Sequence, residues 1–72
     1  HPQEISLRKQ DITVIYSTPD LQTATQLLKK YRVSYVYVGG QERRQYPARG
    51  FEKFEAHFPV AFRGMDVLYR VP

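Results

Sequence analysis

The sequence contains no cysteine, so neither a disulfide nor a thiolate metal site can stabilise the fold. It has no run of about 20 apolar residues that could span a bilayer, and no segment that reads as a signal peptide. Its two histidines, His1 and His57, lie far apart without the close spacing of a metal or acid–base site. These absences predict a soluble chain without cofactor, metal or catalytic group.

Large apolar side chains are what this short chain does have. Of its 72 residues 42% are hydrophobic, including six tyrosines and four phenylalanines. A domain of this size buries only about 60% of the surface of its unfolded chain, and a large apolar side chain contributes roughly 1.5–3 kcal/mol when fully buried. We therefore expect one marginally stable domain over residues 1–72, with residues 1–10 as a poorly ordered leading segment.

The formal charge of +4 would permit binding to nucleic acid, anionic lipid or another polyanion. The arginines and lysines are scattered along the chain, however, and alternate with acidic residues such as Glu52, Glu55 and Asp66. This scatter disfavours a dedicated basic patch. A free-standing basic nucleic-acid-binding module is therefore the alternative function and not the first.

The stretch 11–16 fits two patterns. Ile12, Val14 and Tyr16 alternate as in a strand, whereas Ile12, Ile15 and Tyr16 share one face of a helix. We favour a short helix and leave the strand open.

Residues 19–31 show the clearest helical pattern. A hydroxyl cap at Ser17 or Thr18, proline at position 19 and an acid in the first turn are typical of a helix start. Apolar side chains then recur at steps of three and four, and basic side chains fall in the last turn. The hydroxyls of Ser17 and Thr18 are interpreted as caps, because no base accompanies them that would make a nucleophile.

Residues 33–38 are β-branched and aromatic and predict a strand that is covered on both faces, at the centre of the sheet. Tyr35 and Tyr37 share one face of it and are interpreted as core or cross-strand packing. Gly39-Gly40 ends the strand, and residues 41–45 fit one or two helical turns.

Phe51, Phe54 and Phe58 form an aromatic stripe that predicts a short amphipathic helix, which Pro59 ends. Two strand patterns follow at 60–63 and 67–71, joined by a glycine-containing hairpin.

These elements predict an α/β (α+β) fold, in which two to three short helices pack on a small three-stranded mixed sheet. A right-handed crossover would place strand 60–63 parallel to strand 33–38, and the hairpin would return strand 67–71 antiparallel.

The loop after Gly40 is the best candidate ligand or partner site, with Glu42, Arg43, Arg44 and Tyr46 as its residues. A loop at the end of a strand can direct charges toward a ligand, and arginine can bind a phosphate through two hydrogen bonds. The alternative is that Glu42 and one arginine form an ion pair that holds the loop, which would contribute about 0–1 kcal/mol if exposed.

The order of motifs over residues 11–71 resembles the C-terminal region of the YYY-type family of multi-spanning bacterial and archaeal membrane proteins. The likeness is carried by Asp11-Ile12 with Tyr16, by Leu27-Leu28-Lys29-Lys30-Tyr31-Arg32-Val33, by Tyr35-Val36-Tyr37-Val38-Gly39, by Glu42-Arg43, Tyr46-Pro47, Gly50-Phe51 and Lys53-Phe54, and by Val67-Leu68-Tyr69-Arg70-Val71. Relatives often have proline and an apolar residue where this chain has Gly40-Gln41.

The family is similar to the GT-C type membrane glycosyltransferases, which use lipid-linked sugar donors. The resemblance implies a non-catalytic accessory or interaction domain on the extracytosolic side of a membrane protein. Its partners would be the membrane-embedded part of the parent, and a lipid-linked sugar or anionic headgroups. Because the chain begins at His1-Pro2 and not at methionine, we also expect it to be a fragment of a longer protein.

Overall fold

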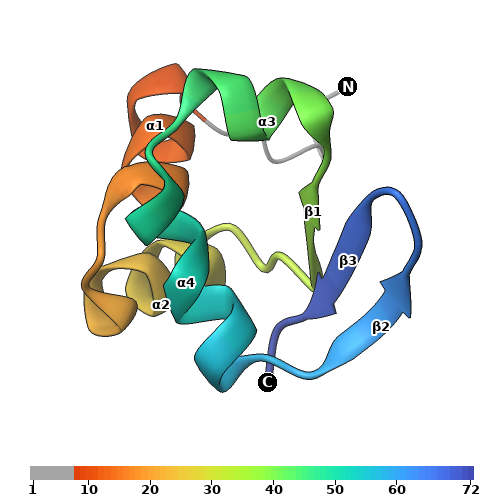
Figure 1. Ribbon diagram of the computed structural model, residues 1–72. Coiled ribbons are helices and arrows are strands. Elements are labelled where there is room, and N and C mark those ends of the chain that lie inside the picture. Colours follow the sequence, from red (N-terminus) through yellow and green to blue (C-terminus); the bar gives the residue numbers. More distant parts are fainter. Residues whose placement is uncertain (1–7) are drawn as a thin grey trace, which may run out of the picture.

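Four helices and three strands are formed by residues 8–72, the part of the chain that the computed structural model describes. In chain order they are α1 (Lys9–Ser17), α2 (Leu21–Lys30), β1 (Tyr35–Val38), α3 (Gly40–Gln45), α4 (Ala48–His57), β2 (Val60–Arg63) and β3 (Val67–Arg70) (Figure 1). The expected α+β class is confirmed, with more helices than the two or three expected. Residues 1–10 were expected to be poorly ordered. Of these, residues 1–7 lie outside the described part of the chain, whereas Lys9 and Gln10 belong to α1.

The ambiguous stretch 11–16 is helical, as favoured. It lies within α1, where Ile15 is buried and Ile12 and Tyr16 are partly buried, while Thr13 is exposed. This is the helical face that the sequence offered, because a strand would have buried alternate residues instead.

The start of α2 differs from the expected one. Ser17 ends α1, and Asp20 is the N-cap of α2, since its carboxylate accepts a hydrogen bond from the Thr23 amide at 3.2 Å. Thr18 has a smaller role: its hydroxyl oxygen accepts from the Asp20 amide at 3.1 Å. A carboxylate is as good an N-cap as a hydroxyl, and Asp20 lies immediately before the first apolar residue of the helix.

The sheet has the strand order β1-β3-β2, and both pairings are antiparallel. The expected mixed sheet is therefore wrong, and so is the central position of β1, which lies at an edge. Because β1 and β2 both run antiparallel to β3, they run in the same direction as each other. They do not pair, however, because β3 lies between them. The hairpin that brings β3 beside β2 leaves the other edge of β3 free, and β1 pairs there with Val36 opposite Tyr69.

Helices cover one face of the sheet only (Figure 1). Val36 and Val38 point into the core, whereas Tyr35 and Tyr37, on the other face of β1, are 52% and 47% exposed. The expectation that this strand is covered on both faces is wrong, because the helices pack on one side of the sheet and leave the two tyrosine residues about half exposed on the other (Figure 1).

The core lies between this covered face and the aromatic stripe of α4. As expected, Phe51, Phe54 and Phe58 are all buried, and they pack with Ile15, Leu28, Val36, Val38, Val67 and Tyr69. The ring of Phe54 lies at its centre, 5.3 Å from the ring of Phe58 and 5.8 Å from that of Tyr69.

Among residues 8–72, no helix combines the length and apolar character that a membrane crossing requires.

Candidate functional site

The four residues predicted as a ligand loop lie in and just after α3, and two of them have structural roles. The Glu42 carboxylate accepts a hydrogen bond from the Gly39 amide at 2.9 Å and so caps the helix. The Tyr46 ring stacks on the Tyr16 ring of α1, with centroids 4.9 Å apart. Both side chains are partly buried, which leaves the two arginines as the exposed members.

The alternative, an ion pair between Glu42 and an arginine, is not formed in the described residues. In the described part of the chain the one ion pair joins Arg63 and Glu55. Arg44 lies exposed beside Gly40, and Arg43 faces a different cleft. The four residues thus lie on α3 and its C-cap and not on an open loop, and their role as a ligand or partner site stays a prediction.

Arg43 lines a cleft of about 330 Å³ between α3, α4 and the β2–β3 hairpin. Within it, Arg63 donates two hydrogen bonds to the Glu55 carboxylate, at 2.9 and 2.7 Å, and the Tyr69 hydroxyl donates a third at 2.7 Å. The remaining lining residues are Ala48, Phe51 and Glu52. Glu55 thus ties α4 to both strands of the hairpin.

The surroundings of Glu55 and Tyr69 in this cleft shift the pKa of both groups away from neutral pH. The hydrogen bond from Arg63, followed by that from Tyr69, holds the pKa of Glu55 below its ordinary range. Burial and the bond to Glu55 raise the pKa of Tyr69 from 10.0 to about 12. Because the carboxylate stays ionised and the phenol stays protonated, the hydrogen bond between them persists at neutral pH and ties α4 to β3.

The outer face of the sheet carries a different feature, an aromatic patch formed by Tyr35, Tyr37, Phe62 and Leu68. Leu68 pairs with Tyr37 on one side and with Phe62 on the other, so these three side chains form a row across all three strands. Phe62 is 62% exposed. Contiguous exposed apolar surface of this kind is typical of interaction sites.

Two charged residues accompany this outer-face patch. The Tyr37 hydroxyl donates to the Asp66 carboxylate at 2.5 Å, and Arg70 lies opposite Tyr35 in the register. Sequence reasoning missed the patch, although a signal for it was present. Tyrosine at every second position of β1, with valine between, separates an aromatic face from an aliphatic one, and only the aliphatic face fits a closely packed core.

Lys53 is a buried cation, and its side chain is only 5% exposed. Its ammonium group donates to the Gly50 carbonyl at 2.5 Å and lies 4.1 Å from the centre of the Phe54 ring. Burial lowers the pKa of Lys53 from 10.5 to about 8. No carboxylate among residues 8–72 forms an ion pair with it, so the charge is stabilised by a carbonyl and a ring alone.

The two histidines contribute no metal site in the described part. His1 lies outside the described residues, and His57 is exposed in the last turn of α4. Among residues 8–72, no three His, Asp or Glu side chains lie close enough together to hold a metal ion.

Compared with known proteins, the chain matches no family model, no curated protein and no solved structure. The resemblance to the YYY-type family therefore stays a hypothesis, supported by the order of its motifs.

Proposed function

We propose that this chain is a non-catalytic interaction domain that binds a protein partner through the outer-face patch. The observation that carries the proposal is the row Tyr37, Leu68 and Phe62, which crosses the whole sheet on the face without helices. Burying large aromatic side chains is the main source of affinity in protein interfaces, where tyrosine and phenylalanine are enriched.

The charges of the patch favour a protein partner over a polyanion. Arg70 and Asp66 carry opposite charges on this face, so it has no excess of positive charge. Asp66 also accepts the hydrogen bond from Tyr37, which places a carboxylate beside the aromatic row. A phosphate backbone would gain no net electrostatic attraction there, whereas a protein surface with an apolar centre and a polar rim fits.

The resemblance to the YYY-type family suggests which protein the partner is. We propose that the partner is the membrane-embedded part of a longer parent protein, with the domain on the extracytosolic side. A parent similar to a glycosyltransferase would bind a lipid-linked sugar, and the exposed guanidinium groups of Arg43 and Arg44 suit its phosphates or anionic headgroups. This part of the proposal rests on sequence motifs, and a parent gene without membrane spans would contradict it.

The proposal is tested by measuring how tightly the isolated domain binds to a parent protein from which the domain has been deleted. The double substitution Tyr35→Ser with Phe62→Ser should weaken binding at least about tenfold, because hot-spot aromatic residues contribute about 2 kcal/mol or more each. The double substitution Gln22→Ser with Gln26→Ser, at exposed positions of α2, is the matched control and should bind normally. Equal binding by both double variants would contradict the proposal.

A second candidate function is the binding of single-stranded nucleic acid. Exposed aromatic rings on an open antiparallel sheet can stack on bases, and the chain carries a charge of +4. Fluorescence anisotropy with a labelled oligothymidine at several salt concentrations tests it. Binding that weakens steeply with salt and is lost on Tyr35→Ser with Phe62→Ser would favour this function; absence of binding at low salt would exclude it.

A further inference from the structure

The outer edge of β1 offers backbone groups to an additional strand. Val71 N donates to Ser34 O at 2.8 Å, so these two residues form a hydrogen-bonded pair of the β1–β3 ladder. Bonded and non-bonded pairs alternate along an antiparallel ladder. The N–H and C=O groups of Tyr35 and Tyr37 therefore point away from β3, toward the edge of the sheet.

One of these four groups already has a partner, and this confirms their direction. The Tyr16 hydroxyl of α1 donates to Tyr37 O at 2.6 Å, and so closes the end of the edge that lies toward α3. No hydrogen bond from elsewhere in residues 8–72 reaches Tyr35 N, Tyr35 O or Tyr37 N. A donor, an acceptor and a second donor are thus presented in the half of the edge around Tyr35.

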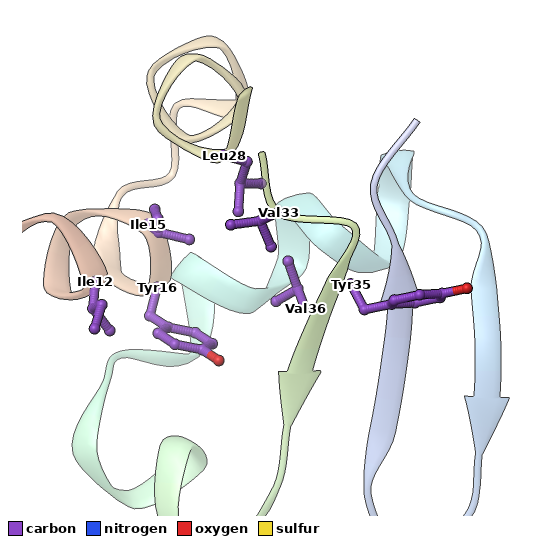
Figure 2. Close-up of a pocket in the computed structure, with 7 residues that line it drawn as sticks. All are labelled: Ile12, Ile15, Tyr16, Leu28, Val33, Tyr35 and Val36. Carbon is purple, nitrogen blue, oxygen red and sulfur yellow. The ribbon is translucent and has the colours of Figure 1, made fainter. Parts of the chain in front are cut away.

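An apolar hollow of about 180 Å³ lies beside this half of the edge. Figure 2 shows Ile15, Leu28, Val33 and Val36 converging on the space between α1, α2 and β1, with Ile12 at its margin. The hollow is on the side of the sheet toward which Val36 points. A residue of an added strand that pairs with Tyr35 would point outward, so its neighbours in that strand would point toward the hollow.

A second hollow shares Ile12 with the first and adds a positive charge, and we call the two hollows together the groove. It has a volume of about 260 Å³ and is also lined by Lys9, Thr13, Gln45 and Tyr46. Lys9 is exposed there, and the whole chain carries a charge of +4. An acidic side chain complements this end of the groove better than a basic one.

We propose that the β1 edge binds an extended peptide from a partner protein as an added strand, with an aliphatic side chain in the first hollow and an acidic side chain near Lys9. In this mode the backbone groups of Tyr35 and Tyr37 supply affinity, and the hollow supplies specificity. The site is distinct from the outer-face patch, since it uses the edge and the helix-covered side of the sheet.

The probe is a short blocked peptide in which valine alternates with serine and which ends in aspartate. It is titrated into the isotope-labelled 72-residue chain while amide and methyl NMR signals are followed. We expect saturable shifts at Tyr35, Tyr37, Ile12 and Val33. Tyr35→Pro removes an edge donor without touching the β3 ladder, so it should weaken binding about tenfold relative to Tyr35→Ala. Ile12→Trp, which fills the hollow, should also weaken binding about tenfold relative to Gln10→Trp, at an exposed position of α1 that lines neither hollow.

Three outcomes would overturn the proposal. The first is an absence of saturable shifts, or shifts confined to the outer-face patch. The second is binding by a chain that begins at Arg8 but not by the full chain, which would assign the groove to residues 1–7. The third is a concentration-dependent dimer that Tyr35→Pro abolishes, which would assign the edge to a second copy. Retained folding of each variant is checked by circular dichroism.

Discussion

Gly50 packs directly against the backbone of Tyr16, where α4 crosses the end of α1. A Cβ atom at position 50 would lie 1.9 Å from the Tyr16 carbonyl oxygen and 3.0 Å from the Cα of Ser17. The obstructing atoms belong to a helix backbone and cannot move aside as a flexible side chain can. The absence of a side chain at Gly50 is therefore what sets the distance between α1 and α4.

The substitution Gly50→Ala should consequently destabilise the domain by at least about 2 kcal/mol, although alanine is the better helix former. Separation of the two helices would also disturb the contact between Tyr16 and Phe54, whose centroids are 6.3 Å apart. Urea unfolding followed by circular dichroism measures the change. Gly40→Ala, in the first turn of α3, is the control and should change stability by less than about 1 kcal/mol, since only the flexible end of Arg44 lies near.

Lys53 should make stability depend on pH in the alkaline range. Its pKa is about 8 in the folded chain and 10.5 when it is exposed. Between these values the unfolded chain holds a proton that the folded chain has released, so the free energy of unfolding rises with pH through this window. Lys53→Met should stabilise the domain by about 1 kcal/mol at pH 7, because it removes a buried charge without a carboxylate partner.

Urea unfolding of both proteins from pH 7 to 10 checks this expectation. The advantage of Lys53→Met should shrink as the wild-type lysine loses its charge. Lys29→Met, at an exposed position of α2, controls for the general loss of a charge. The expectation would be contradicted if the two proteins differed in stability by a constant amount across the pH range, or if Lys53→Met were the less stable at pH 7. Either result would show that the buried ammonium group does not destabilise the fold.

Arg32, which follows the C-cap of α2, has a positive φ of 56°, a conformation that glycine adopts without strain. Its amide donates to Lys29 O at 3.1 Å, and the amide of Val33 donates to Leu28 O at 2.9 Å. Arg32→Gly should therefore stabilise the domain by about 0.5–1 kcal/mol, measured as a shift of the urea midpoint at an unchanged slope. Arg32→Val should have the opposite effect, since a β-branched residue is strained there. Destabilisation by glycine would mean that the arginine side chain contributes more than the backbone strain costs.

Tyr69 should add a second pH dependence of opposite sign. Its pKa is about 12 in the folded chain, so between pH 10 and 12 the unfolded chain loses a proton that the folded chain keeps. Stability therefore falls with rising pH in this window. Tyr69→Phe should cost about 1 kcal/mol at pH 7 through the lost hydrogen bond to Glu55, and this difference should narrow above pH 10. A difference that stays the same at pH 11 would contradict the assignment.

Most elements could be predicted from the sequence because their signals are local. The stripe of Phe51, Phe54 and Phe58 and the basic last turn of α2 are helical periodicity and end chemistry, and both were found. The position of Gly50 inside α4 was missed, because the need for a small residue there arises only from the crossing with α1.

Strand order and the candidate site could not be predicted in the same way. Whether β1 or β3 lies at the centre depends on which edge of the hairpin remains free, and this is a property of the assembled sheet. Glu42 and Tyr46 looked functional as members of a polar loop, but the first caps α3 and the second stacks on Tyr16. The partner of Tyr46 lies thirty residues away and leaves no mark in the local sequence, whereas Glu42 caps its own helix three residues after Gly39. The alternation of tyrosine and valine in β1, by contrast, was a usable signal for an open face.

Cysteine labelling at position 62 tests the proposed role of the outer-face patch most directly. The chain has no cysteine, so Phe62→Cys places one reactive thiol in this patch, and Gln26→Cys places one on exposed α2 as a reference. The rate of maleimide modification is measured in the isolated domain and in the longer parent protein. We expect the thiol at position 62 to react readily in the isolated domain and at least about tenfold more slowly in the parent, with the reference thiol unchanged, because an interface core excludes solvent. Equal rates at position 62 in both proteins would contradict the account.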